Sequence, residues 1–222
     1  MAVITISREF GSVGDDLGQR IAQKLGYHFV DKEFMGALLG RYGLINFEEE
    51  FETPERFWER FNAERGQRRV QMVDMLNQVV GGVARHGNVV IQGRSGFAIL
   101  AGFADVLHVR LQAPFPVRVS YVAAWRRLPP EQAEEVVRQG DKARKSFVEE
   151  FYGVAWGDIE AFDLVVNTNK VPPDLAEPWV IEASKALAQH PATAKPTTAS
   201  IEVDRVLADV ITAELGCATE HH

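Results

Sequence analysis

The chain is poor in cysteine and has no long apolar segment. Cys217 is the single cysteine among 222 residues, so no disulfide can form within the chain, which is compatible with a reducing compartment. No apolar run approaches the roughly 18 residues that span a bilayer. The opening segment, MAVITISREF, lacks the basic stretch followed by a long apolar one that marks a secretion signal. These absences predict a cytoplasmic protein without a membrane partner.

Positive charge is also scarce. There are 24 Lys and Arg residues against 31 Asp and Glu residues, which gives a net charge of -7. A general nucleic-acid binder needs a basic surface, so the sequence predicts no nucleic-acid partner. A small basic pocket for a phosphate remains compatible with this balance. The 46% hydrophobic and 25% charged content is typical of a globular protein with one sizeable core.

Strand-like and helix-like segments alternate along most of the chain. Apolar, β-rich runs cover 2–6, 27–30, 88–92, 105–111 and 162–167. Helical spacing is found in 17–25, 32–42, 67–85, 114–127 and 173–188. This alternation predicts a mostly parallel sheet with helices on both faces, which is a three-layer α/β/α arrangement. Ligands of such sheets bind at the carboxyl ends of strands, where Asp31, Arg94 and the first loop all fall.

The remaining segments interrupt or follow this pattern. Residues 43–66 combine an acidic run, a proline and several aromatics, and are expected to form a mobile helical insert. Residues 128–153 are highly charged. Residues 189–200 are rich in Pro, Thr and Ala and are expected to be a linker. The final segment, 201–222, contains a helical apolar pattern that could dock on the main domain, 1–188, or on a second subunit or partner protein.

The loop after the first strand has features of a phosphate site. Its glycines let backbone amides turn inward, and the N-terminus of the following helix adds partial positive charge. The residues expected to contact a phosphate-bearing cofactor are Gly11, Ser12, Val13, Gly14, Asp15, Asp16 and Leu17. The Gly-Lys-Ser/Thr ending of a full phosphate-loop motif is absent. Taken alone, the loop is equally compatible with an ordinary strand-to-helix turn.

Four stretches together carry a family resemblance. They are ITISREFGSVG with the following helix and LGYHFVDKE, then VVIQGRSG, then LHVRLQAPFPVRV, then GDKARKSFVEEFYGVAWGDIEAFDLVVNT. In this order, over most of residues 2–188, the chain resembles the cytidylate kinase-like family of P-loop phosphotransferases. The resemblance implies a P-loop NTPase-type core with a five-stranded parallel sheet. It also implies ATP with Mg²⁺ as donor and a nucleoside monophosphate as acceptor, with 43–66 as the acceptor-binding insert and 128–153 as the lid.

The resemblance assigns a role to residues after the second and third strands. Arg94 matches the arginine of a Gly-Arg-Asp motif that grips the acceptor phosphate, a task that suits a guanidinium fork. Ser95 stands where that motif has its aspartate, which bears on cytosine or ribose selectivity. Asp31 matches an acidic position that helps to hold the acceptor nucleotide. It is equally well placed to be the N-cap of a helix that starts at Lys32.

The lid segment supplies the cations that the first loop lacks. Gly140 to Arg144 matches the family's lid motif, so Lys142, Arg144 and Lys145 are expected to act in catalysis in place of the missing lysine. Asp141 is expected to orient these cations on the substrate side of the lid. The alternative is that this charge run is simply a solvated helix face.

The acidic pair that opens the first helix is unusual for the family. Cytidylate kinases have lysine where this chain has Gly14 and threonine where it has Asp16. Both aspartates could cap the helix, which we favour for Asp15. Asp16 could instead bind magnesium directly through a hard carboxylate oxygen.

Three functions are therefore compatible with the sequence, of which the third is a kinase for a different small hydroxyl compound, since a fold does not fix its substrate. The first is an ATP-dependent phosphotransferase acting on CMP, dCMP or a related small acceptor, which Arg94 and the lid cations favour. The second is a catalytically degenerate, nucleotide-sensing or scaffolding protein, which Asp15, Asp16 and Ser95 favour. In the second case the C-terminal helix would bind a partner or form a homodimer.

Overall fold

The computed structural model describes residues 2–14, 16–41, 63–93, 95–189 and 195–218. Most of the predicted insert, 43–66, lies outside these ranges. So do the predicted site residues Asp15 and Arg94. Among the described helices, none has both the length and the apolar character needed to cross a membrane.

Five strands form one parallel sheet. They are β1 (Val3–Arg8), β2 (His28–Val30), β3 (Val89–Gln92), β4 (Val106–Gln112) and β5 (Leu164–Asn167). Their order across the sheet is β2-β3-β1-β4-β5, and every neighbouring pair is parallel. The predicted five-stranded parallel sheet is confirmed, with β1 at its centre.

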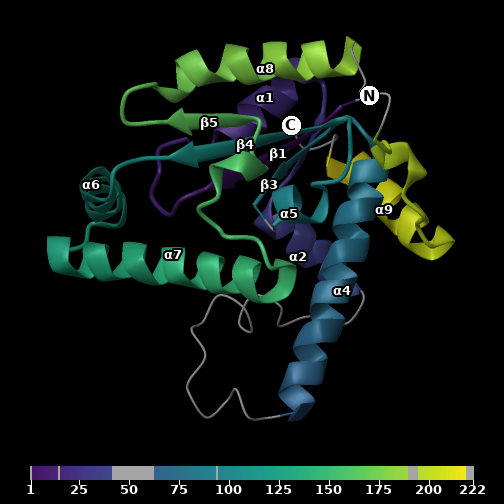
Figure 1. Ribbon diagram of the computed structural model, residues 1–222, viewed down its shortest axis with the longest axis horizontal. Coiled ribbons are helices and arrows are strands. Elements are labelled where there is room, and N and C mark those ends of the chain that lie inside the picture. The colour runs from purple at the N-terminus through teal and green to yellow at the C-terminus, as the bar shows by residue number, and fades with distance from the viewer. Residues whose placement is uncertain (1, 15, 42–62, 94, 190–194, 219–222) are drawn as a thin grey trace.

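Helices cover both faces of the sheet, as Figure 1 shows. On one face lie α1 (Leu17–Leu25) and α8 (Pro173–Gln189). On the other lie α2 (Lys32–Arg41), α4 (Ala63–His86), the short α5 (Gly96–Ile99) and α9 (Arg205–Ala218). Beyond the carboxyl ends of the strands lie α6 (Phe115–Arg126) and α7 (Pro130–Tyr152), so the predicted lid segment is mainly one long helix.

The alternation of side chains along β1 explains this layering. Val3 packs into the cluster beneath α2, α4 and α9, whereas Ile4 and Ile6 pack into the cluster beneath α1 and α8. Successive residues of a strand point to opposite faces, so a strand that is buried along nearly its whole length needs cover on both sides. The loop after β1 is thereby anchored at the middle of a buried sheet.

The C-terminal helix packs on its own domain. Leu207, Ile211 and Leu215 of α9 are buried in the same cluster as α4. The fit is close, because a Cβ at Gly82 of α4 would lie 2.5 Å from Ile211 Cδ1. Of the two docking modes that the sequence left open, docking on the domain is the one observed. Val206 of the same helix is exposed, and binding of a partner or of a second copy stays a prediction.

The end of the predicted linker is also attached to the domain. The amide and hydroxyl of Thr198 donate hydrogen bonds to the Asp105 carboxylate, at 2.8 and 2.7 Å. The amide of Ala104 donates to the carbonyl of Pro196 at 2.9 Å. These contacts hold the described part of the linker, from residue 195, beside the amino end of β4.

Candidate active site: a cationic pocket beside the first loop

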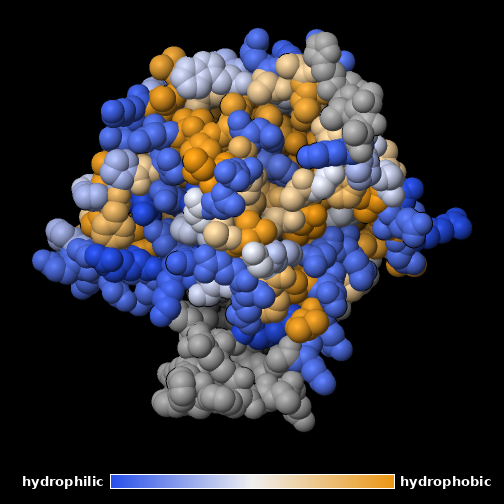
Figure 2. Space-filling view, in the orientation of Figure 1, coloured by the Kyte–Doolittle hydropathy of each residue, from blue (hydrophilic) through white to orange (hydrophobic). Residues whose placement is uncertain are grey.

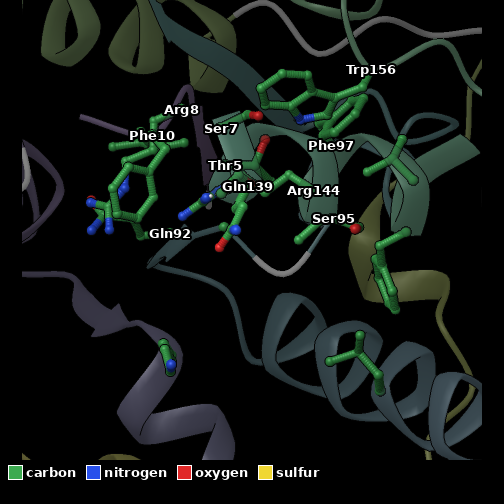
Figure 3. Close-up of a pocket in the computed structure, with 18 of the residues that line it drawn as sticks. Thr5, Ser7, Arg8, Phe10, Gln92, Ser95, Phe97, Gln139, Arg144 and Trp156 are labelled. Carbon is green, nitrogen blue, oxygen red and sulfur yellow. Dashed lines mark hydrogen bonds between the residues drawn. The ribbon is translucent and has the colours of Figure 1, made fainter. Parts of the chain in front are cut away.

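A cavity of about 390 Å³ opens at the carboxyl ends of β1 and β3. Its walls come from these two strands, the end of α6, the middle of α7 and the segment after α7. In Figure 3 Arg8 and Phe10 stand on one side of the cavity, Phe97 and Trp156 stand on the other, and Gln139 and Arg144 lie between them. The position is the one at which open parallel sheets bind ligands.

The charged side chains among the described lining residues all carry positive charge. The cavity lining includes the cations Arg8, Lys32, Arg126 and Arg144, and no carboxylate belongs to the lining that the structure describes. The chain as a whole carries a net charge of -7, so this concentration of positive charge is local. Such a wall complements an anion, and guanidinium groups in particular match phosphate oxygens.

The other side of the cavity is apolar and aromatic. Phe97 and Trp156 are 3% and 9% exposed, and Phe147 and Leu76 complete that wall. Gln92, Ser95 and Gln139 add hydrogen-bonding groups. A pocket with a cationic end, an apolar wall and a few amides suits a ligand that joins an anionic group to a flat or apolar body.

Trp156 is fixed by a buried arginine. Arg110 on β4 lies 4.7 Å from the centre of the Trp156 ring and donates to the Trp156 carbonyl at 2.8 Å. Burial lowers the pKa of Arg110 from its ordinary value, although the nearby Glu9 carboxylate works in the opposite direction. An arginine remains protonated in spite of such a shift, so Arg110 acts as a fixed cation that ties the segment after α7 to the sheet.

Of the loop after β1, Phe10 lines this pocket, whereas the described residues predicted to contact phosphate lie next to it, outside the lining. Gly11 and Gly14 have φ angles of 77° and 120°, which glycine adopts readily. Ser12 is 1% exposed, and its hydroxyl donates to the carbonyl of Glu9 at 2.9 Å. The Ser12 side chain therefore stabilises the turn through a hydrogen bond inside the loop. Its predicted contact with a phosphate stays a prediction.

Some backbone amides of the loop already donate hydrogen bonds within the protein. The amide of Phe10 donates to Asp141 Oδ1 at 3.0 Å, and the amide of Ser12 donates to the carbonyl of Glu9 at 3.2 Å. Within the described part of the chain, the amides of Gly11, Val13 and Gly14 have no such partner. These three amides, in the loop that leads into α1, are the ones that a phosphate could use.

Leu17 and Asp16 differ in how they are placed. Leu17 is fully buried in the core between α1 and the sheet, and its amide donates to the carbonyl of Gly14. Asp16 is the N-cap residue of α1, but its side chain makes no capping hydrogen bond. Its carboxylate instead lies 3.5 Å from Arg20 Nε, and Arg20 also pairs with Asp174 and Glu177. The side-chain cap that we considered for Asp16 is thus not formed.

The structure defines the local backbone positions of Asp31 and Ser95, which follow β2 and β3. The Asp31 carboxylate accepts a hydrogen bond from the Phe34 amide at 3.0 Å, so the N-cap interpretation of Asp31 is confirmed. A contact between Asp31 and an acceptor stays a prediction. Ser95 is buried, lines the pocket and has a φ of 55°, which places it in a tight turn after Gly93.

The lid cations do not all reach the cavity. Arg144 lines it and donates to the carbonyl of Gly140, one helical turn earlier, at 2.9 Å. Lys142 and Lys145 are exposed on other sides of α7 and are not part of the lining. Figure 2 shows the outer face of α7 as a band of hydrophilic side chains. Successive helical residues are rotated by about 100°, so a run of neighbouring cations cannot share one face.

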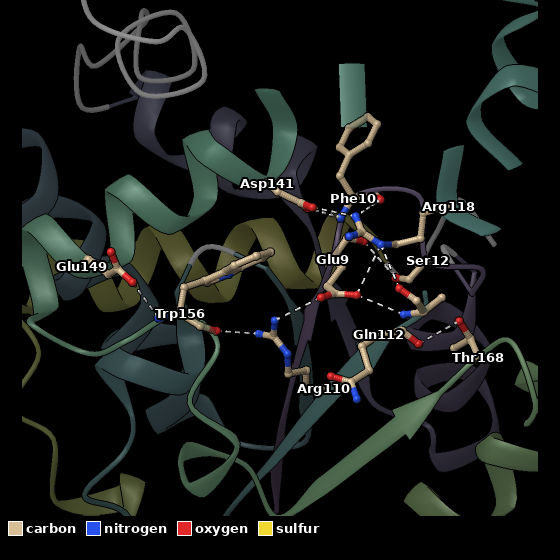
Figure 4. A network of polar contacts seen from close by, with 11 residues as sticks. Glu9, Phe10, Ser12, Arg110, Gln112, Arg118, Asp141, Glu149, Trp156 and Thr168 are labelled. Atoms are coloured by element: carbon tan, nitrogen blue, oxygen red, sulfur yellow. Dashed lines mark hydrogen bonds and ion pairs between the residues drawn. The ribbon is translucent and has the colours of Figure 1, made fainter. Parts of the chain in front are cut away.

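Asp141 lies at a junction between three segments rather than in the cavity lining. Its Oδ1 accepts from the Phe10 amide, and its Oδ2 pairs with Arg118 Nη1 at 2.7 Å. Arg118 is 5% exposed and also contacts Glu9 and the Phe10 carbonyl. Figure 4 shows how this network joins the loop after β1 to α6 and α7. The predicted contact of Asp141 with a substrate remains untested, whereas its structural partners are observed.

Several residues of the site had no signal in the sequence. Arg126 ends α6 in the run Trp125-Arg126-Arg127, with nothing to show which arginine faces the pocket. The spacing of Arg8 slightly favours a structural or surface role over one near phosphate, whereas the structure places Arg8 in the pocket lining. Arg118 and Glu9 lie on different elements, and their contact becomes visible only when β1, β4 and α6 are assembled. The one usable clue in the sequence would have been a charged residue in a segment that is expected to be buried next to a loop.

Taken together, the parallel sheet, the glycine-containing loop between β1 and α1 and the cationic pocket under α7 define an α/β protein of the P-loop kinase type. The model of the cytidylate kinase-like family matches residues 3–170, and the chain belongs to this family.

Curated relatives support this membership at low identity. The cytidylate kinase of Ignicoccus hospitalis is 28% identical over 179 residues, which cover 78% of this chain and 94% of the relative. The cytidylate kinase of Pyrococcus horikoshii is 27% identical over 176 residues, which cover 78% of this chain and 82% of the relative.

Solved structures show the same fold. A protein of unknown function from Eubacterium ventriosum superposes with a TM-score of 0.62 at 17% identity, over 84% of this chain and 99% of that one. A gluconokinase from Sinorhizobium meliloti superposes with a TM-score of 0.51 at 13% identity, over 85% and 94% of the two chains. The fold of this protein is thus one that other proteins, including a small-molecule kinase, also adopt.

Proposed function

We propose that this protein is an ATP-dependent phosphotransferase that acts on CMP, dCMP or a related small phosphorylated acceptor. The observation that carries the proposal is the cationic pocket. Arg8, Lys32, Arg126 and Arg144 line it without a carboxylate among the described lining residues. Phosphoryl transfer needs positioning and neutralisation of charge more than covalent chemistry, and such a pocket supplies both.

The loop before α1 and the cavity would bind different substrates. The Gly11, Val13 and Gly14 amides fit the phosphates of ATP, because they lie in the loop before α1 and have no hydrogen-bond partner among the described residues. The cavity would take the acceptor, with its body against Phe97 and Trp156, and the cavity arginines would neutralise both the acceptor phosphate and the transferred phosphate of ATP. Arg94, which lies outside the described residues, is expected to join these cations.

The fit to magnesium rests on one carboxylate. No group of three or more ligating side chains occurs among the described residues. Magnesium is often held by only one or two carboxylates together with substrate phosphates and water. The side chain of Asp16 is 63% exposed at the start of α1, and Asp16 follows the loop whose amides are proposed for ATP. Asp16 would therefore hold the ion only when the nucleotide is bound.

The test is an ADP-formation assay with purified protein, ATP, magnesium and a panel of nucleoside monophosphates. We expect CMP or dCMP to stimulate ADP formation, and we expect Arg94→Ala and Arg144→Ala to abolish it. Asp16→Asn should remove the dependence of ATP affinity on magnesium. ATP affinity that is the same with and without magnesium in the unaltered protein would rule out the role given to Asp16.

A nucleotide-sensing role is the second candidate. It is favoured by the pairing of Asp16 with Arg20 and by the absence of a lysine from the loop. In this case ATP would raise the unfolding temperature, but no acceptor would increase ADP formation. The same assay therefore separates the two functions.

A further inference from the structure

We propose that Phe10 is a positioning residue whose ring holds Arg126 and Arg144 at the pocket. In a loop that lacks a lysine, this aromatic side chain would gather two arginines from outside the loop. The inference rests on the proposed function, since it concerns how that site is given its charge. It concerns a residue that neither binds phosphate nor takes part in the reaction itself.

The first observation is the place of the two guanidinium groups. Arg144 Cζ lies 5.0 Å from the centre of the Phe10 ring, and Arg126 Cζ lies 5.3 Å from it. All three residues line the cavity. The two arginines come from different helices, α7 and the end of α6. Phe10 is the residue whose ring both of them contact. The face of an aromatic ring attracts such cations electrostatically.

The second observation is that the peptide groups of Phe10 are fixed. Its amide donates to Asp141 on α7 at 3.0 Å, and its carbonyl accepts from Arg118 on α6 at 2.9 Å. Arg118 and Asp141 pair with each other at 2.7 Å, which closes a ring of contacts around the Phe10 backbone. Figure 4 shows Phe10 held in this way, with its side chain directed away from Glu9.

The third observation is the close approach of α7 to the ring. A Cβ at Gly140 would lie 2.7 Å from both Cγ and Cδ2 of Phe10. Gly140 is therefore the residue that lets the helix backbone touch the ring. Arg144 lies one turn later and donates to the Gly140 carbonyl at 2.9 Å. The ring thus rests on the same helical turn that carries one of the two arginines.

Electrostatics explains what the Phe10 ring contributes beside the two guanidinium groups. Two like charges over one ring repel each other, and that repulsion is strongest when no anion is bound. The ring's negative face offsets part of the repulsion in the empty pocket. Phe10 would therefore keep the site ready for a polyphosphate, so that less rearrangement is needed when the ligand arrives.

The experiment compares Phe10→Leu, Phe10→Met and Phe10→Tyr. Leucine and methionine preserve apolar volume without an aromatic face, whereas tyrosine keeps the face. The ligand-free readout is the NMR signal of the arginine side chains, assigned by the loss of each signal in Arg126→Lys and Arg144→Lys. We expect ring-shifted signals in the unaltered protein and in Phe10→Tyr. In the other two variants we expect the Arg144 signal close to that of free arginine and a smaller shift for Arg126, whose Cζ also lies 5.1 Å from the centre of the Trp125 ring.

The second readout is binding of inorganic triphosphate and of ATP by calorimetry. We expect affinity to fall about tenfold in Phe10→Leu and Phe10→Met and to be largely retained in Phe10→Tyr. In an Arg126→Met/Arg144→Met background, Phe10→Leu should cause no further loss, because the interacting partners are already gone. Cooperative urea unfolding of each variant checks that the fold is intact.

The outcomes distinguish this inference from the proposed function. Arginine signals and triphosphate affinity that are unchanged in folded Phe10→Leu and Phe10→Met would overturn the role of Phe10, even if the protein makes ADP. A ring shift of Arg144 that disappears in these variants, together with a smaller shift of Arg126, would support it. If the unaltered protein then made no ADP with any acceptor, the proposed catalysis would fail while the role of Phe10 in arranging the arginines stood.

Discussion

Arg118 on α6 and Asp141 on α7 form an ion pair, with 2.7 Å between Nη1 and Oδ2, and both also bind the backbone of Phe10. The side chains of Arg118 and Asp141 are 6% and 20% exposed. A pair that is this buried is anchored by its additional hydrogen bonds, because the loss of hydration must be offset. The contact joins the lid segment to the loop that precedes α1.

Removing one member of this pair should be costly. We expect Asp141→Ala to lower the free energy of unfolding by about 3 kcal/mol, because it leaves the buried Arg118 guanidinium with fewer partners. Urea unfolding followed by circular dichroism measures this. The control is Lys142→Ala, the exposed neighbour on the same helix, which should change stability by less than about 0.5 kcal/mol. Equal stability of the two variants would mean that the pair is dispensable.

The sheet could be predicted because its signals are local. Each buried strand is a short apolar run bounded by glycine or a charged residue, and each helix has its own period. The four-residue α5 was missed because Gly96–Ile99 is too short to show a period. The docking side of α9 could not be chosen, because an apolar helical stripe does not say whether it is covered by its own domain or by another chain.

The site was harder to predict, because its charges meet only in the folded protein. The lid motif drew attention to three cations, but helix geometry brings Arg144 to the cavity and leaves Lys142 and Lys145 exposed. Phe10 gave no sign of its role, since an aromatic residue in a loop usually packs. Its two arginine neighbours lie more than a hundred residues further along the chain.

The lid cations should differ in importance. We expect Arg144→Ala to lower kcat/KM for ADP formation by about a thousandfold, since a guanidinium that neutralises a transferring phosphoryl group has effects of this order. Lys145→Ala should lower it by only about threefold, because Lys145 is exposed outside the cavity lining. Steady-state kinetics at matched ionic strength makes the comparison. A Lys145→Ala effect as large as that of Arg144→Ala would show that the lysine reaches the phosphates.

Gly140 should not tolerate a side chain. Alanine in place of a helical glycine is normally stabilising by about 1 kcal/mol. At Gly140, however, a Cβ would lie 2.7 Å from two carbons of the Phe10 ring, so the ring or the helix must move. We expect Gly140→Ala to lower the free energy of unfolding by about 1 kcal/mol.

The matched control for this change is Gly40→Ala in α2, where a Cβ meets nothing within 4 Å among the described residues. It should raise the unfolding free energy by a few tenths of a kcal/mol or more, as helix propensity dictates. Urea titrations of both variants give the sign of each change. A stabilising Gly140→Ala would mean that the ring is free to move aside.

Stability should fall on acidification because of a buried histidine on β4. Burial is the main cause that lowers the pKa of His108 below 6.5, while the Asp163 carboxylate opposes the shift and Lys195 adds to it. The Nδ1 of His108 lies 2.7 Å from the Thr5 hydroxyl. With a lowered folded pKa, the unfolded chain binds the extra proton first as the pH drops below about 6.5. The histidine's contribution is therefore complete above that pH and is lost below it.

The expected slope from one such group is at most about 1.4 kcal/mol per pH unit. Unfolding free energies between pH 5 and pH 8 should thus decrease toward acid in the unaltered protein. The decrease should be smaller in His108→Asn, which has no proton to take up at this position. His28, whose pKa is also lowered by burial, remains in both proteins and cancels in the comparison. Parallel pH profiles would contradict the assignment to His108.

The C-terminal helix should behave as part of the domain core. Ile211 is 1% exposed and packs against Gly82 of α4, whereas Val206 on the same helix is 63% exposed. We expect Ile211→Ala to lower the unfolding free energy by about 3 kcal/mol through the cavity it leaves, and Val206→Ala to change it by less than about 0.5 kcal/mol. Both values should be independent of protein concentration, because the buried contact lies within one chain. A loss of stability in Ile211→Ala that grows on dilution would instead show that α9 also holds two subunits together.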